Sequence, residues 1–123
     1  MILQLEIKGQ QQSGKNRILI TRTGHRYPPK RFVEWRDAVI AQIRQQTKGR
    51  FYFQSPSKIG VMYVPGDKRR RDVPGMMDSL FHVLERAGVV ADDALLENAE
   101  WATMSVDREN PRLTVHIQEK DAA

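Results

Sequence analysis

The stretch from Lys68 to Asp93, KRRRDVPGMMDSLFHVLERAGVVADD, constrains this chain more than any other part of the sequence. It begins with four consecutive cations, continues through an aspartate, a proline and a glycine into a run of helical spacing, and closes on two aspartates. The apolar residues of that run are spaced as on the buried face of an amphipathic helix. They are Met76, Met77, Leu80, Phe81, Leu84 and Ala87. The stretch therefore predicts a helix that packs on a core and is flanked at both ends by charged loops.

The two ends of this helix carry residues with known positional preferences. Pro74 suits the first helical position, where a missing N–H costs nothing. Gly88 suits the position just past the helix end. Asp72 then lies immediately before the helix, near its positive end, where negative charge is favoured.

The same stretch carries both aspartates and a run of cations. The aspartates Asp72, Asp78, Asp92 and Asp93 carry the hard oxygen donors that Mg²⁺ prefers. The run Lys68–Arg71 can neutralise phosphates. Together they indicate a site that holds a polyanion beside a metal ion. Each feature alone is also compatible with a solvated basic loop, a helix-end aspartate or a polar surface stripe.

The charge of the chain is unevenly distributed. Residues 1–71 hold 16 Lys and Arg against 4 Asp and Glu, a net charge of +12, whereas residues 72–123 carry a net charge of −7. A polarised chain of this kind favours a nucleic-acid partner for its basic part, and the alternative is a basic surface without a partner. The residues expected to contact DNA are Lys15, Asn16, Arg17, Arg22, Arg26, Lys30, Arg31, Lys68, Arg69, Arg70 and Arg71.

Hydrophobic periodicity elsewhere predicts the remaining elements. Strands are expected at Ile2–Lys8, Arg17–Arg22, Lys58–Val64, Glu100–Val106 and Arg112–Gln118, and a first helix at Lys30–Gln46. The last two strands are expected to form a hairpin through Asn110 and Pro111. The order β-β-α-β-α-β-β predicts one α/β (α+β) domain over residues 1–123, with a mixed sheet and two main helices.

The segment Gly9–Lys15 nearly fits the phosphate-binding loop G-x-x-x-x-G-K-[ST]. Asn16 replaces the hydroxyl that would hold Mg²⁺, and the residues that follow are strand-like where the motif needs a helix. The segment is therefore read as a polar loop whose Lys15 and Arg17 can touch phosphates, and a nucleotide site is the alternative.

Composition excludes several classes of protein. The chain has no cysteine, so it has neither disulfides nor zinc–thiolate sites and is compatible with a reducing cytoplasm. It has no apolar run long enough to cross a membrane and no signal-peptide pattern, so we expect a cytoplasmic protein without a membrane partner.

The run from Pro65 through Asp93 contains P-G-D-K-R-R-R-D followed by L-x-x-x-L-x-x-A-G-V-V-x-D-D. This pattern resembles the RusA-type Holliday-junction resolvases, found in phages and prophages. The resemblance covers nearly the whole chain, because the opening strand, the loop with Asn16, the first helix and the closing strands fall in order. It implies a small homodimeric endonuclease that nicks four-way or other branched DNA with Mg²⁺ in recombination and repair, in a bacterial host or encoded by a phage.

The resemblance also implies roles for individual residues. The family's first essential aspartate matches Asp72, and the third matches Asp93, with Asp92 beside it. The family's second aspartate falls at Pro74, and its lysine falls at Asp78. Asp78 lies one helical turn beyond Pro74 and leans back toward it. We therefore expect Asp78 to supply the missing carboxylate, so that Asp72, Asp78 and Asp93 share one cation and carry catalysis.

Two other hypotheses stay open at this point. The changes at Pro74 and Asp78 are compatible with a DNA-binding protein of the same fold that has lost catalysis. The third hypothesis is a nucleotide-binding protein that uses Gly9–Lys15.

Overall fold

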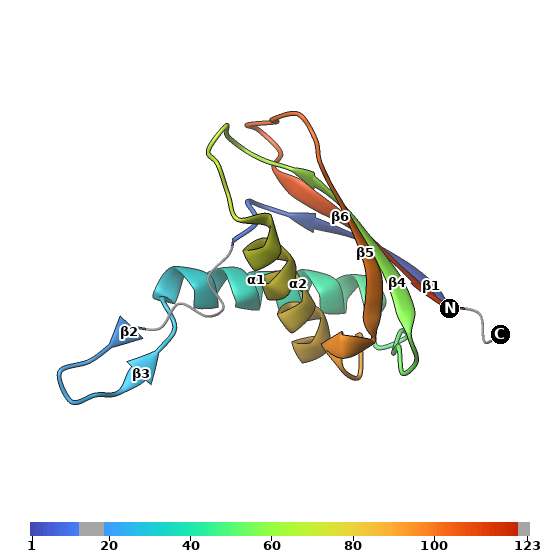
Figure 1. Ribbon diagram of the computed structural model, residues 1–123, viewed down its shortest axis with the longest axis horizontal. Coiled ribbons are helices and arrows are strands. Elements are labelled where there is room, and N and C mark those ends of the chain that lie inside the picture. Colours follow the sequence, from blue (N-terminus) through green and yellow to red (C-terminus); the bar gives the residue numbers. More distant parts are fainter. Residues whose placement is uncertain (13–18, 121–123) are drawn as a thin grey trace.

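A computed structural model describes residues 1–12 and 19–120 (Figure 1). The strands are β1 (Ile2–Lys8), β2 (Leu19–Ile20), β3 (Arg26–Tyr27), β4 (Ser57–Val64), β5 (Leu96–Thr103) and β6 (Arg112–Glu119). The helices are α1 (Lys30–Thr47), α2 (Val73–Arg86) and the short 3₁₀ helix η1 (Asp93–Leu95). Lys15, Asn16 and Arg17, which were predicted to contact DNA, lie outside the described residues.

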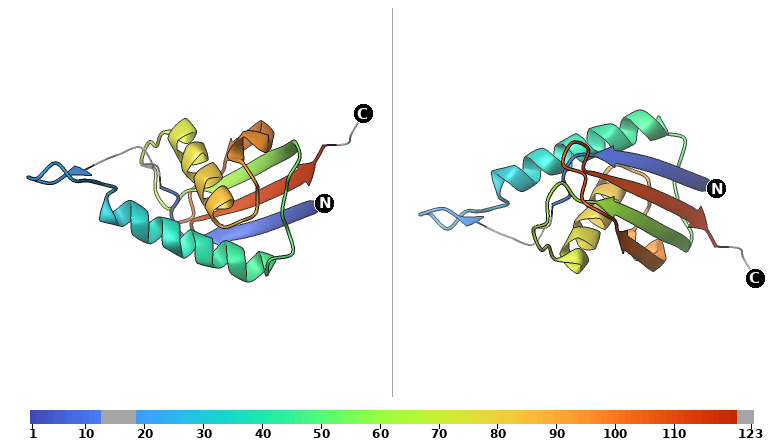
Figure 2. Two further views of the ribbon diagram at one scale, coloured as in Figure 1. Left: turned by 90° about the horizontal axis from the view of Figure 1, so that it is seen from below. Right: turned by 90° about the horizontal axis from the view of Figure 1, so that it is seen from above.

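The main sheet has four strands in the order β1-β6-β4-β5. β6 is antiparallel to both β1 and β4, whereas β4 and β5 are parallel, so the sheet is mixed. The two helices lie on one face of this sheet (Figure 2). The structure confirms the predicted α+β fold with a mixed sheet and two main helices.

Side-chain alternation along the strands decides which face the helices cover. In β1, Leu3, Leu5 and Ile7 are buried while the residues between them are exposed. β4 and β6 alternate in the same way, so their apolar residues meet the buried sides of α1 and α2. The buried residues of α2 are Met76, Ser79, Leu80, Val83 and Leu84. This packing fixes the orientation of α2 and leaves the polar residues at its two ends accessible.

The predicted hairpin between the last two strands is wrong. β4 lies between β5 and β6, and β5 runs parallel to β4 instead of antiparallel to β6. β5 also spans Leu96–Thr103 instead of Glu100–Val106. Its residues are mostly exposed and include Asn98 at a φ of 49°, so no clean alternation marks its position in the sequence.

The region after residue 18 also differs from the prediction. A single strand was expected over Arg17–Arg22, but the described part of this region forms a small hairpin of β2 and β3. Leu19 pairs with Tyr27, and Ile20 pairs with Arg26. Because Leu19 and Ile20 form a strand and not a helix start, the chain here lacks the element that a phosphate-binding loop requires.

The outer edge of β1 is covered by two side chains of α1. The amide of Gln46 accepts from the Glu6 N–H at 3.0 Å and donates to the Glu6 carbonyl at 2.7 Å. The amide of Gln42 bonds Lys8 in the same two ways, at 2.8 and 3.0 Å. These glutamines take the place of a further strand and attach α1 to the sheet.

No helix in the described ranges is both long enough and apolar enough to cross a membrane.

Candidate metal centre

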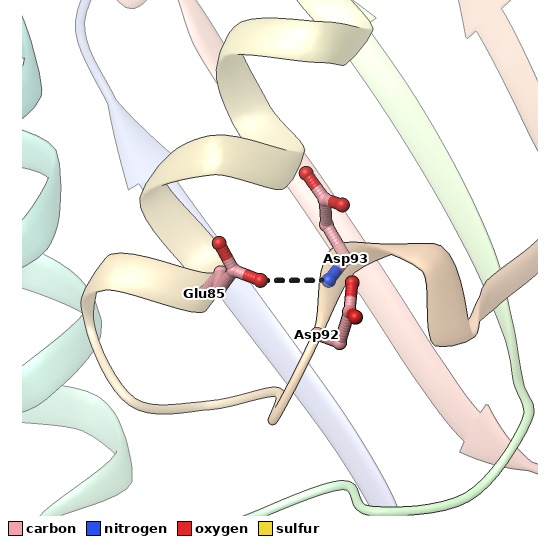
Figure 3. A group of neighbouring side chains, drawn as sticks. All are labelled: Glu85, Asp92 and Asp93. Carbon is pink, nitrogen blue, oxygen red and sulfur yellow. Dashed lines mark hydrogen bonds between the residues drawn. The ribbon is translucent and has the colours of Figure 1, made fainter.

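Three carboxylates gather where the chain leaves α2 and enters η1 (Figure 3). Glu85 comes from the last turn of α2, and Asp92 and Asp93 come from the loop that returns past it. One oxygen from each of the three lies within 4.8 Å of the other two. In the part of the chain that the structure describes, this is the group whose geometry could hold a metal ion.

The loop that carries the two aspartates is anchored in the core. Gly88 ends α2 with a φ of +80°, a left-handed conformation that favours glycine. Val89 and Val90 are buried, and the backbone of Phe53 bonds the loop on both sides, donating to the Val89 carbonyl at 2.8 Å and accepting from Ala91 N–H at 2.9 Å. Asp92 and Asp93 therefore project from a loop whose backbone is held by the core.

Local hydrogen bonds set the direction of the carboxylates. Glu85 Oε1 accepts from the Asp93 N–H at 3.1 Å, and Asp92 Oδ1 accepts from the Ala94 N–H at 2.9 Å. Figure 3 shows the Asp93 carboxylate pointing along α2, toward the earlier turns of the helix. Each of these bonds uses one carboxylate oxygen, so Glu85 and Asp92 each keep a second oxygen for a cation.

The donor set suits a hard divalent cation. Mg²⁺ binds oxygen at about 2.0–2.1 Å, so two ligands on opposite sides of the ion lie roughly 4 Å apart, and Ca²⁺ allows slightly more. The upper limit of 4.8 Å between the three oxygens is close to this span, and small side-chain rotations bring them within it. All donors are carboxylate oxygens, the type that both cations prefer.

Asp72 and Asp78 are not in this group of described carboxylates. Asp72 is the N-cap residue of α2 and its side chain makes no capping bond. Glu85 is thirteen residues further on, so the two lie about 20 Å apart along the helix axis. Asp78 lies seven residues before Glu85, about 10 Å along the axis on nearly the same face. The expected meeting of Asp72, Asp78 and Asp93 is not seen, and which aspartates bind metal stays a prediction.

Glu85 is the residue that the sequence reasoning missed. It is not among the apolar residues of the predicted helix, and no role was predicted for it. The available signal was its position in the last turn before Gly88, because a chain that reverses after a glycine stop passes close to that turn.

The basic stretch before α2 is divided into two parts. Arg71 forms a bidentate salt bridge with Asp67, in which Nη1 donates to Oδ1 at 2.7 Å and Nη2 donates to Oδ2 at 3.0 Å. The Arg69 N–H also donates to Asp67 Oδ1, at 2.9 Å. Lys68, Arg69 and Arg70 are exposed, and their side chains make no ion pair with the described residues. Arg71 therefore shapes the loop, while the other three cations face solvent.

The salt bridge between Asp67 and Arg71 shifts the pKa of both side chains. The hydrogen bond from Arg71, followed by the bond from the Arg69 N–H, lowers the pKa of Asp67 from 3.8 to about 2. The same bond to Asp67 raises the pKa of Arg71 above its ordinary value. Both groups are therefore charged at neutral pH.

The other predicted DNA contacts lie at the far end of the molecule from η1. Arg22 and Arg26 are exposed on the β2–β3 hairpin, and Arg31 is exposed in the first turn of α1. Lys30 pairs with Glu34 at 3.6 Å on the helix surface, an exposed pair of small energetic value.

A separate depression of about 540 Å³ lies on the uncovered face of the sheet. It forms where Gly60 has no side chain, between Met62, Glu100 and His116. It contains neither Asp92 nor Asp93, so it is not part of the acidic group.

Comparison with known proteins found one relative of this chain among those with a described activity. No protein-family model matches the chain. The chain is 31% identical over 81 residues to the crossover junction endodeoxyribonuclease RusA of Aquifex aeolicus (strain VF5). This similarity supports a RusA-like family. The match covers 66% of this chain and 64% of the Aquifex RusA, so the chain spans slightly less than two thirds of that relative.

Proposed function

We propose that this chain is a divalent-metal-dependent endonuclease that nicks four-way DNA junctions in recombination and repair. The observation that carries the proposal is the convergence of Glu85, Asp92 and Asp93 in a chain similar to RusA. The name of the relative supplies the substrate class, and the carboxylates supply a reason for metal dependence.

We assign Glu85, Asp92 and Asp93 as the residues that would hold Mg²⁺. A bound Mg²⁺ would activate a water and offset charge on the scissile phosphate. The alternative ligand set, with Asp72 and Asp78 beside Asp93, rests on the family pattern. Asp72→Asn and Asp78→Asn distinguish the two sets, because only the alternative set requires these carboxylates for metal binding.

A nuclease must also hold the DNA backbone. Lys68, Arg69 and Arg70 can each neutralise a phosphate. The Asp67–Arg71 bond fixes the loop from which they project. These cations precede α2, whereas Glu85 is in its last turn, about 20 Å away along the helix axis, so they would bind phosphates at that distance from the metal centre.

Two nicks in symmetry-related strands require two sites, and one chain offers one acidic group among its described residues. We propose that a two-fold dimer supplies the pair. Light scattering is expected to return twice the chain mass of 14.2 kDa. A monomer at the concentrations that support nicking would contradict the dimer.

The rival function is junction binding without catalysis, favoured by Pro74 at a position where the family carries an aspartate. A synthetic four-way junction with one labelled strand separates the two functions. The nuclease is expected to leave paired, symmetric nicks with Mg²⁺ and none with EDTA. A junction that is bound but intact under both conditions would favour the rival.

A further inference from the structure

The β2–β3 hairpin stands away from the rest of the described chain in all three views (Figures 1 and 2). Every residue from Leu19 to Tyr27 is exposed. Three of them are large and apolar: Leu19 is 41% exposed, Ile20 65% and Tyr27 40%. An isolated two-stranded hairpin is marginally stable in water, so this one is expected to gain stability from a partner.

The tip of the hairpin is nevertheless well formed. The Gly24 N–H bonds the Thr21 carbonyl at 3.0 Å, and the Thr21 N–H bonds the His25 carbonyl at 2.9 Å. Gly24 has a φ of +83°, as expected for a turn closed by a left-handed residue. The Thr21 hydroxyl adds a bond from the His25 N–H at 3.0 Å. The hairpin is thus a preformed arm.

Its two faces differ in chemistry. Directly paired residues of an antiparallel ladder project to the same face, so Leu19 and Tyr27 share one face while Ile20 and Arg26 share the other. Arg22 lies in the turn at the tip. The sequence contains no acidic residue between Glu6 and Glu34.

This charge decides between two kinds of partner. A second copy that presented the same hairpin would bring Arg22 and Arg26 against their like charges. A polyanion would be attracted by them. The face of Leu19 and Tyr27 requires an apolar surface on its partner. DNA offers such a surface only where a duplex is interrupted and bases are no longer stacked on both sides.

We propose that the β2–β3 hairpin is an arm that enters branched DNA at the branch point. Arg22 and Arg26 contact phosphates, and the Tyr27 ring, supported by Leu19, stacks on a base exposed there. The inference rests on the proposed function and extends it, because it names the element that distinguishes branched DNA from linear duplex. The acidic group cannot make that distinction, since any phosphate satisfies it.

The test compares two variants at one position. Tyr27→Leu keeps an apolar side chain beside Leu19 but removes the ring, and Tyr27→Phe keeps the ring. Tyr52, 48% exposed beyond the other end of α1, provides the matched control Tyr52→Leu. Stacking of a base on an aromatic ring is worth enough that Tyr27→Leu should weaken four-way-junction binding about tenfold. Tyr27→Phe and Tyr52→Leu should bind like the wild type, and linear-duplex binding should be unchanged in all three.

Photocrosslinking supplies a second readout that a merely structural role would not move. A junction with 5-iododeoxyuridine at the branch point should crosslink to Tyr27, and one with the same base in the middle of an arm should not. Equal loss of junction and duplex binding in Tyr27→Leu would overturn the proposal, as would unchanged junction binding. A change from dimer to monomer in light scattering would overturn it in favour of a subunit contact.

Both readouts report binding, so they are independent of cleavage. A wild type that crosslinks from the branch point but nicks nothing upholds the arm and overturns the nuclease. A wild type that binds junctions no better than duplexes overturns the arm, whether or not it cleaves DNA.

Discussion

At the scale of single residues, Asp67 controls the shape of the loop before α2. Its carboxylate accepts from the Arg71 guanidinium and from the Arg69 N–H, and its pKa falls to about 2. Because this pKa is depressed, the ion pair stabilises the folded loop fully above a pH of about 3.8. That stabilisation is lost as the pH falls through about 2.

A carboxyl NMR titration is expected to give Asp67 a midpoint of about 2 in the wild type. Arg71→Gln removes the main cause of the shift and should return the midpoint toward 3.8. Arg70→Gln is the matched control, since Arg70 is the neighbouring cation and makes no bond to Asp67, and it should leave the titration in place. A wild-type midpoint near 3.8 would show that the pair does not form.

Glu85 is the residue that the structure adds to the predicted acidic site. Its replacement by Gln keeps the shape but removes one of the three charges. Even groups that only orient metal ligands affect affinity about 10–100-fold, so Glu85→Gln should weaken Mn²⁺ binding at least about tenfold in calorimetry. Glu109→Gln, which changes an exposed glutamate outside the acidic group, should leave the affinity unchanged. Equal affinities in the two variants would remove Glu85 from the site.

Only part of the acidic group could be predicted from the sequence. The aspartates of the returning loop could be predicted because a double aspartate after a glycine stop is visible in the sequence. Their meeting with Glu85 could not, since it depends on how the Phe53 backbone holds the loop. Arg71 was predicted as a DNA contact, but its partner Asp67 lies one helical turn's spacing earlier in an irregular loop, where no periodicity marks the pair.

At the scale of elements, Gln42 and Gln46 attach α1 to the open edge of β1. Each amide makes two bonds to one β1 residue. Because the bonds are exposed, water replaces part of their value, and Gln42→Ala with Gln46→Ala should lower the free energy of unfolding by about 1–2 kcal/mol in urea denaturation. Gln45→Ala, on the exposed side of the same helix, should change it far less.

The double glutamine variant should also self-associate more than the wild type. Removing both amides exposes unpaired backbone groups of β1, and such edges pair with other strands. Sedimentation velocity would detect the larger species. A double variant with wild-type stability and sedimentation would show that these bonds contribute nothing beyond water.

Elements were predictable where side chains alternate against one core face, as in β1, β4 and β6. β5 was misplaced because most of its residues are exposed and its pairing with β4 joins segments separated by α2. The β2–β3 hairpin was predicted only as one strand, because its two short strands are exposed and show no alternation of buried and exposed residues.

At the scale of the whole molecule, the basic half of the chain should dominate DNA binding. Association releases counterions from the phosphates, so the logarithm of affinity should fall linearly with the logarithm of salt concentration. Replacing Lys68, Arg69 and Arg70 by Ala should lower the magnitude of that slope by about 2–3 and weaken duplex and junction binding alike. Binding titrations with no salt dependence would make the basic half a solvated surface only.

We propose above that the acidic group at the end of α2 carries Mg²⁺-dependent cleavage of branched DNA. The most direct measurement is the nicking rate of Asp93→Asn on a four-way junction at saturating protein, beside Glu109→Gln. We expect Asp93→Asn to bind the junction at least as tightly as the wild type, because a negative charge is gone, yet to produce no nicks above the EDTA background. Glu109→Gln should nick normally. Wild-type nicking by Asp93→Asn would show that the acidic group does not carry the cleavage.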